Sequence, residues 1–144
     1  MRKKILVPVD LSDDHPGEIT FAVDLARLLD AQIVLLHVVD YVPTVLPVEL
    51  PAGYPAPQLD VVRESAERKL AEAAKRFDGL DVKQVVEIGA AAHEIVLCAE
   101  RESVDQIVVG SHRHGAIARM LLGSVAERVA RTAPCPVTIV RERA

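Results

Sequence analysis

Residues 106–140 read QIVVGSHRHGAIARMLLGSVAERVARTAPCPVTIV, and this stretch decides the fold of the chain. The mainly apolar run of residues 106–109 stops at Gly110, which predicts a buried strand followed by a polar turn. Ser124 is followed three residues later by Glu127, the pattern of a capping box, which predicts a helix with Ser124 as its cap. The apolar stripe expected for this helix is Val125, Val129, Ala130 and Ala133.

Strand and helix patterns alternate along the rest of the chain. We expect strands at residues 4–9, 32–39, 82–88, 105–110 and 136–141. Helical spacing of apolar residues recurs in residues 19–29, 59–77, 92–101 and 124–133. This alternation predicts a single-domain α/β fold over residues 1–144, a doubly wound, five-stranded, mainly parallel sheet with helices on both faces.

A parallel sheet of this kind binds ligands beyond the carboxyl ends of its strands. Pro8 and Asp10, Val39 and Asp40, and the turn at residues 110–115 all follow expected strands, so we expect them to meet in one crevice. The start of the last helix adds free backbone N–H groups and the positive end of a helix dipole, which attract anions. A phosphate group would fit such a site.

Composition narrows the class of function. The net charge of −4 and the 3% aromatic content argue against binding of nucleic acid. The apolar run after Lys4 is too short for a signal peptide, and no run reaches membrane-spanning length, so we expect a cytoplasmic protein without membrane contact. Cys98 and Cys135 are far apart and predict neither a zinc site nor a disulfide, but two buried apolar thiols.

One long loop interrupts the compact pattern. Residues 41–57 carry five prolines and several apolar side chains between an expected strand and the long helix. Such a loop is either a flap over the crevice, a contact with a second subunit, or a surface excursion held extended by proline.

Two common nucleotide motifs are incomplete. Gly110 and Gly115 have the spacing of a P-loop, but Ala116 and Ile117 stand where that motif needs lysine and serine or threonine. The dinucleotide fingerprint GxGxxG is absent. A Walker-type nucleotidase and a nicotinamide or flavin dehydrogenase are therefore disfavoured.

Several separate segments together resemble the universal stress protein family, and the resemblance covers nearly the whole chain. They are VPVD at residues 7–10, HV at residues 37–38, VGSH at residues 109–112, LGSVAER at residues 122–128 and APCPV at residues 133–137. Gly89 matches the family's Gly-x-Pro turn, with Ala91 in place of the proline. The resemblance implies an adenine nucleotide alpha hydrolase-like fold with strand order 3-2-1-4-5.

The resemblance also implies a nucleotide site. Members that bind nucleotides carry a GxxGx9G[ST] motif, whose outer positions correspond to Gly110, Gly123 and Ser124, while Arg113 takes the place of the middle glycine. A side chain there either blocks approach of the backbone to phosphate, with Gly115 relieving the strain, or places a guanidinium on the phosphate. The implied nucleotide-binding residues are Pro8, Val9, Asp10, Val38, Val39, Gly110, Ser111, Arg113, Gly115, Gly123, Ser124 and Val125.

Within this set, the resemblance implies that Asp10 binds the ribose and that the strand-end apolar residues line the adenine. Simpler interpretations stay open. Asp10 would equally satisfy loop amides, and Ser124 would equally be a helix cap alone. His112 and His114 are typical of solvated loop residues, and His37 of a hydrogen-bonded core residue.

Three functions follow as hypotheses. The first is a stress-response switch that binds ATP, or ADP or AMP, with or without Mg²⁺, and changes its contacts with an unknown protein partner. The second is a nucleotide-independent interaction module of the same fold, and the third is a slow ATPase, for which no catalytic or metal-binding residue is apparent. By the resemblance, and because Val137, Ile139 and Val140 would otherwise expose an apolar sheet edge, we expect a homodimer through the last strand.

Overall fold

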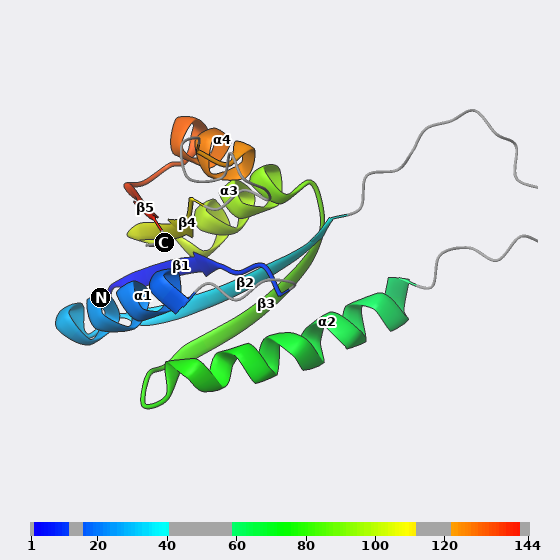
Figure 1. The fold of residues 1–144 in the computed structure, drawn as a ribbon, viewed down its shortest axis with the longest axis horizontal. Coiled ribbons are helices and arrows are strands. Elements are labelled where there is room, and N and C mark those ends of the chain that lie inside the picture. Colours follow the sequence, from blue (N-terminus) through cyan, green and yellow to red (C-terminus); the bar gives the residue numbers. More distant parts are fainter. Residues whose placement is uncertain (1, 12–15, 41–58, 112–121, 142–144) are drawn as a thin grey trace, which may run out of the picture.

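The structure is a computed structural model that describes residues 2–11, 16–40, 59–111 and 122–141. Strands and helices alternate along these residues, as the apolar patterns predict (Figure 1). The strands are β1 (Lys4–Pro8), β2 (Gln32–Asp40), β3 (Val82–Gly89), β4 (Gln106–Gly110) and β5 (Val137–Val140). The helices are α1 (Pro16–Leu29), α2 (Leu59–Ala74), the 3-10 helix η1 (Lys75–Phe77), α3 (Ala91–Glu102) and α4 (Ser124–Thr132).

The strands form one sheet in the order β3-β2-β1-β4-β5, and every pair of neighbours is parallel. The predicted strand order is therefore confirmed, and the sheet within the described residues is wholly parallel. β1 pairs with β2 from Lys4 opposite Gln32 to Pro8 opposite Leu36. The chain crosses to one side of β1 for β2 and β3, and to the other side for β4 and β5, which brings the carboxyl ends of β1 and β4 to the point where the winding direction reverses.

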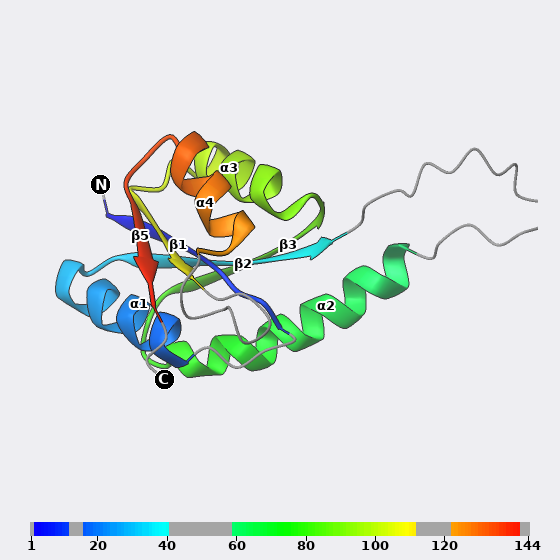
Figure 2. The same cartoon turned by 45° about the horizontal axis from the view of Figure 1, so that its top comes forward.

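Helices cover both faces of the sheet, also as predicted. Figures 1 and 2 show α1 and α2 on one face and α3 and α4 on the other. Two separate clusters of buried side chains form the core, one between the sheet and each helix pair. Neighbouring residues of one strand divide between them: Ile5 and Val7 join the α1/α2 cluster, and Leu6 joins the α3/α4 cluster. Because both faces are covered, the inner strands β1, β2 and β4 are almost continuously apolar.

The predicted ends of the elements are close to those observed, with one difference in kind. A single helix was expected over residues 59–77, whereas α2 ends at Ala74 and tightens into η1. The side chain of Phe77 is buried in the α1/α2 cluster. The tighter turn therefore ends the helix with its last apolar residue directed into the core.

The amino end of the sheet is held by charged groups. Arg2 contacts Asp30 and Asp81, with its nearest carboxylate oxygen 3.1 Å away on Asp81. Asp105 accepts a hydrogen bond from the backbone N–H of Lys4 at 2.9 Å, which lowers the pKa of the Asp105 carboxyl. These contacts lie at the amino ends of the strands, opposite the carboxyl ends where a crevice is expected.

Candidate functional site

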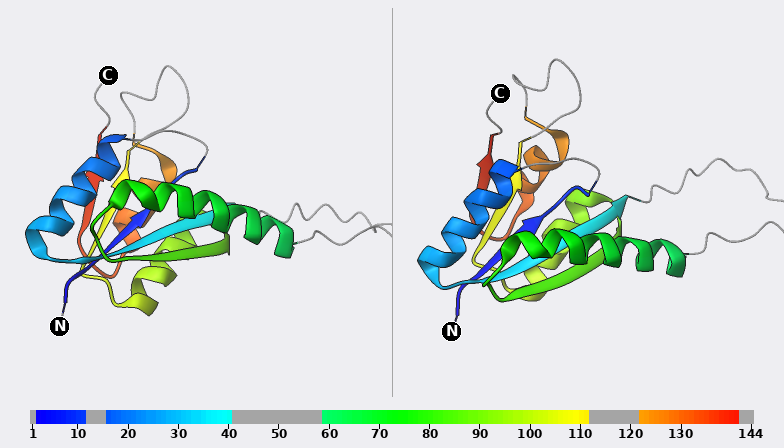
Figure 3. Two further views of the ribbon diagram at one scale, coloured as in Figure 1. Left: turned by 90° about the horizontal axis from the view of Figure 1, so that it is seen from below. Right: turned by 60° about the horizontal axis from the view of Figure 1, so that its bottom comes forward.

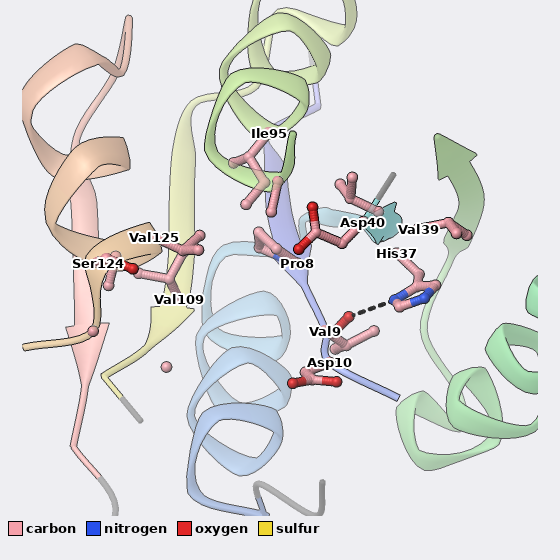
Figure 4. Close-up of a pocket in the computed structure, with 15 residues that line it drawn as sticks. Pro8, Val9, Asp10, His37, Val39, Asp40, Ile95, Val109, Ser124 and Val125 are labelled. Carbon is pink, nitrogen blue, oxygen red and sulfur yellow. Dashed lines mark hydrogen bonds between the residues drawn. The ribbon is translucent and has the colours of Figure 1, made fainter. Parts of the chain in front are cut away.

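A cleft of about 540 Å³ opens at the carboxyl ends of β1, β2 and β4, between the first turns of α3 and α4 (Figure 4). This size is ordinary for a small-molecule site, for which volumes of roughly 300–1,000 Å³ are usual. The cleft lies at the reversal point of the sheet, where the crevice rule predicts a ligand. Its lining residues are Pro8, Val9, Asp10, His37, Val38, Val39, Asp40, Ala91, Ile95, Val109, Gly110, Gly123, Ser124, Val125 and Ala126.

The end of β1 forms the floor of the cleft and is fixed by its neighbour β2. The N–H of Val9 donates to the carbonyl of Leu36 at 2.8 Å. The carbonyl of Val9 in turn lies 3.0 Å from Nδ1 of His37, and since a carbonyl only accepts, Nδ1 carries the proton (Figure 4). His37 was predicted to be a hydrogen-bonded core residue; its hydrogen bond is confirmed, but the side chain is half-buried and lines the cleft.

Two carboxylates enter the cleft from different strands. Asp10 follows β1, and Asp40 ends β2 with its carboxylate directed toward Pro8 (Figure 4). Apolar side chains fill the space around them, chiefly Val38, Val39 and Ile95. A carboxylate accepts hydrogen bonds only, so this part of the cleft is suited to an apolar group that carries hydroxyl or amino donors.

The start of α4 differs from the predicted capping box. The N-cap is Gly123, no side chain caps the helix, and Ser124 is its first helical residue. The Glu127 carboxylate lies 2.6 Å from Arg131, one turn along the helix, and so does not reach back to the cap. The physical reason is that an i,i+4 ion pair on the exposed face competes for the same carboxylate. The prediction that Ser124 serves as a cap is therefore wrong.

The missing cap leaves backbone donors at the cleft. The first intrahelical hydrogen bond runs from the N–H of Glu127 to the carbonyl of Gly123 at 3.0 Å. Helix geometry therefore gives the N–H groups of Ser124, Val125 and Ala126 no acceptor within α4. All three residues line the cleft. The positive end of the α4 dipole thus faces the cavity, which is the arrangement expected for an anion site.

The buried face of α4 also differs from the predicted stripe. Ala126 and Val129 are buried, Ala133 packs partly against the same cluster, and Val125 and Ala130 are exposed. Gly123, the N-cap, is itself buried, and Val125 lies at the flank of the buried face. Val125 is consequently turned out of the core and contributes to the cleft wall.

Ser111 lies between the cleft and the last strand. Its N–H donates to the carbonyl of Val140 at 3.0 Å, and its carbonyl accepts from the N–H of Gly123 at 3.3 Å. The structure does not place Ser111 in the cleft lining. Arg113 and Gly115, together with His112 and His114, lie outside the described residues, as does the loop of residues 41–57.

Sequence reasoning missed the contribution of α3. Ala91 and Ile95 form the wall opposite α4, and α3 too begins without a side-chain cap, at Ala90. The contribution of α3 was predictable from the rule that ligands bind beyond the carboxyl ends of the strands, because β3 ends at Gly89 on the same edge of the sheet and α3 follows it. Gly89 has a φ of +155°, which L side chains rarely adopt, so glycine suits the turn that leads from β3 into α3.

Other chemistry is not indicated in the part of the chain that the structure describes. No group of three or more histidine, cysteine or acidic side chains there is arranged to hold a metal ion, and no described helix is long and apolar enough to cross a membrane. Burial raises the pKa of the Cys98 and Cys135 thiols, so both stay protonated and weakly nucleophilic at neutral pH. Cys98 is buried as predicted, whereas Cys135 is only half-buried.

Comparison with known sequences assigns the family. The sequence model of the universal stress protein family matches residues 1–141. The chain belongs to the universal stress protein family. Among curated members, it is 36% identical over 143 residues to universal stress protein MJ0531 of Methanocaldococcus jannaschii, and the match covers 97% of this chain and 82% of the relative.

Solved structures of universal stress proteins share the fold. UspA of Lactobacillus plantarum superimposes with a TM-score of 0.72 at 27% identity, covering 98% of this chain and 99% of the other. A universal stress protein in complex with cAMP superimposes with a TM-score of 0.63 at 26% identity, covering 99% and 98%. The sheet is thus that of the adenine nucleotide alpha hydrolase-like fold.

Proposed function

We propose that this universal stress protein binds an adenine nucleotide, ATP in the first place, in the cleft between β1, β2 and α4. The observation that carries the proposal is the cleft itself: it joins the uncapped start of α4 to an apolar compartment flanked by Asp10. A nucleotide needs these two environments side by side. The relative in complex with cAMP, at 26% identity, supports a ligand of this class.

The proposed orientation follows from charge. Phosphates are drawn to the N–H groups of Ser124 and Val125 and to the glycines Gly110 and Gly123 beside them, away from the carboxylates. Asp10 then accepts hydrogen bonds from the ribose hydroxyls. The adenine lies between Pro8 and the side chains of Val38 and Val39. Mg²⁺, where present, would enter with the phosphates. Contacts of the ligand with four further residues stay sequence predictions: Val9, Ser111, Arg113 and Gly115.

We further propose that occupancy of the cleft acts as a regulatory switch in a cytoplasmic stress response. The hydrogen bonds of Ser111 support this, because they join Gly123 at the start of α4 to Val140 at the end of β5. An anion that orders the start of α4 would therefore also change the stability of the carboxyl end of β5. By linkage, a partner that binds the end of β5 would change the affinity for the anion by the same factor. The protein partner that reads the switch would contact this side of the molecule.

The proposed homodimer forms through β5, and the two sheet edges explain the choice. On β3, Lys83 and Glu87 carry charges, and Arg63 donates to the carbonyl of Val86 at 2.8 Å, so this edge is protected against pairing. On β5 the sequence VTIV has no charge and every side chain is half-exposed. An unprotected edge of this kind is completed by a second copy in two-fold, antiparallel pairing.

The nucleotide proposal is tested on freshly purified protein. Mass spectrometry of released small molecules identifies any copurifying nucleotide, and ATP at a hundredfold excess over its dissociation constant is expected to raise the melting temperature by about 8 °C. The variant Asp10→Ala should lose most of this shift. Asp60→Ala, an exposed aspartate at the start of α2, is the matched control and should keep it.

Protein that neither carries a nucleotide nor responds to ATP, ADP or AMP would contradict the proposal. The nucleotide-independent interaction module would then be the function to test. An ATP response that survives Asp10→Ala unchanged would instead contradict the proposed place of the ribose.

A further inference from the structure

An apolar stripe runs along the exposed flank of α1. Phe21, Leu25 and Leu28 are spaced by four and three residues, so they lie on one face of the helix. Leu25 packs partly against the core, but the side chains of Phe21 and Leu28 are 40% and 81% exposed. We call these three residues the α1 stripe. Aligned apolar side chains on a surface are unusual without a partner, whereas scattered ones are ordinary.

The direction of the α1 stripe follows from the other flank of the helix. On that flank, Arg27 donates to the carbonyl of Asp78, 3.5 Å away, just after η1. The buried face of α1 includes Ala22 and Ala26. The α1 stripe and Arg27 lie on opposite flanks of this buried face, so the stripe points away from α2. Figure 3 shows α1 beside β5, at the end of the molecule remote from the projecting part of α2. The stripe therefore borders the β5 edge.

Strand pairing alone is a small interface. β5 has four residues, whereas a stable dimer commonly buries about 800 Å² on each partner. Flanking surface must supply the remainder. Two-fold pairing of β5 with its copy places both α1 helices on the same face of one continuous sheet.

The spacing across the two-fold axis suits contact between the helices. α1 contacts β1, β4 and β5 and so lies over β4, and neighbouring strands are about 4.8 Å apart, so the two helix axes would lie roughly 14 Å from each other. Helices pack directly at about 8–10 Å, and side chains as long as phenylalanine and leucine bridge the longer distance. The α1 stripe supplies such side chains on the facing flank.

We infer that the α1 stripe and the β5 edge form one continuous docking surface for a second copy of this chain. The inference rests on the proposed homodimer and extends it from strand pairing to a helix contact across the two-fold axis. The stripe then supplies a substantial part of the free energy of association. It also explains why exposed leucine and phenylalanine face outward on this helix.

Charge substitutions test the helix contact. Leu28→Glu and Phe21→Glu each place a charge in the apolar helix contact, and each is expected to weaken the dimer at least tenfold in sedimentation velocity dilution series. The control is Val61→Glu, a 55% exposed apolar residue on α2, on the far side of the molecule, which should leave the dissociation constant unchanged. Melting curves of each variant, recorded at the same fraction of dimer, show whether the variant is folded. Leu28 is 81% exposed, so its replacement is less disruptive to the fold than that of Phe21.

Two outcomes would overturn the inference, and only one of them would also refute the proposed homodimer. A dimer of Leu28→Glu and Phe21→Glu as tight as the wild type, while Ile139→Asp on β5 gives monomer, would refute the helix contact and leave the strand dimer standing. A monomeric wild-type protein at micromolar concentration would refute the proposed homodimer as well. ATP binding, measured on the same samples, keeps the nucleotide proposal separate from both.

Discussion

His37 links the cleft to the sheet through a single hydrogen bond. Its Nδ1 donates to the carbonyl of Val9, directly before Asp10, and the bond therefore fixes where the backbone of β1 turns into the cleft. The side chain is half-buried, so the carbonyl would not be fully compensated by water if the donor were removed. We regard His37 as a positioning residue for Asp10.

Replacing His37 with phenylalanine is expected to lower the free energy of unfolding by about 1 kcal/mol and to weaken ATP binding several-fold. His37→Asn should restore much of both, since its side-chain amide nitrogen takes the place of Nδ1. Calorimetric titration and denaturant unfolding measure the two effects, with His93→Phe on the exposed side of α3 as control. Equal ATP affinity in wild type and His37→Phe would show that the bond has no positioning role.

At the residue scale, sequence reasoning found most residues that line the cleft but misjudged the start of α4. The strand-end residues Pro8, Asp10, Val38 and Val39 were found because apolar runs have visible ends. The role of Ser124 was misassigned, because the capping box and an i,i+4 ion pair compete for Glu127 and only three-dimensional context decides between them. Ala91 and Ile95 were missed because their helix borders the cleft without carrying any motif.

At the scale of elements, α3 is tied to the edge strand β3 by a charge pair. Nζ of Lys83 lies 2.7 Å from Oε1 of Glu102, whose side chain is 11% exposed. The hydrogen bond from Lys83 lowers the pKa of the Glu102 carboxyl below its ordinary value. The unfolded chain therefore binds a proton at Glu102 more readily than the folded chain does, and the folded state gains stability from this group as pH rises.

The charge pair makes a prediction about pH. Its contribution should be complete above the ordinary glutamate pKa of about 4.3 and should be lost as pH falls through the lowered value. Glu102→Gln is expected to cost about 0.5–1 kcal/mol at pH 7 and little at pH 3, measured by urea unfolding across that range. Glu100→Gln, at an exposed position of the same helix, is the control and should change the free energy of unfolding only slightly at pH 7 and at pH 3. A Glu102→Gln deficit that persists undiminished at pH 3 would contradict the assignment.

The order and faces of the elements were predictable, but their packing in detail was not. Mainly apolar runs at the strands and helical spacing between them sufficed for the layered sheet, and the resemblance supplied its strand order. The stripe of α4 was partly misassigned because a helix of nine residues offers two plausible apolar faces. Burial of Gly123 and Ala126 against the α3/α4 cluster selected one of them.

At the scale of the whole molecule, the cleft and the β5 edge lie on either side of Ser111. The cleft takes its walls from both halves of the sheet, and the Ser111 hydrogen bonds reach from the start of α4 to the last strand. A protein built in this way can report occupancy of a small-molecule site at an interface without moving a domain. The charged β3 edge and the apolar β5 edge favour the β5 side for the proposed interface.

Backbone amide NMR of the full chain titrated with ATP locates the bound nucleotide residue by residue. We expect the N–H resonances of Ser124, Val125 and Ala126 to shift furthest, with a similar shift at Asp10 and a smaller one at Ser111. The amides of Arg2 and Asp105, at the opposite end of the sheet, should stay in place. Saturation by ATP with the α4 amides unmoved and shifts centred elsewhere would contradict the nucleotide site described above.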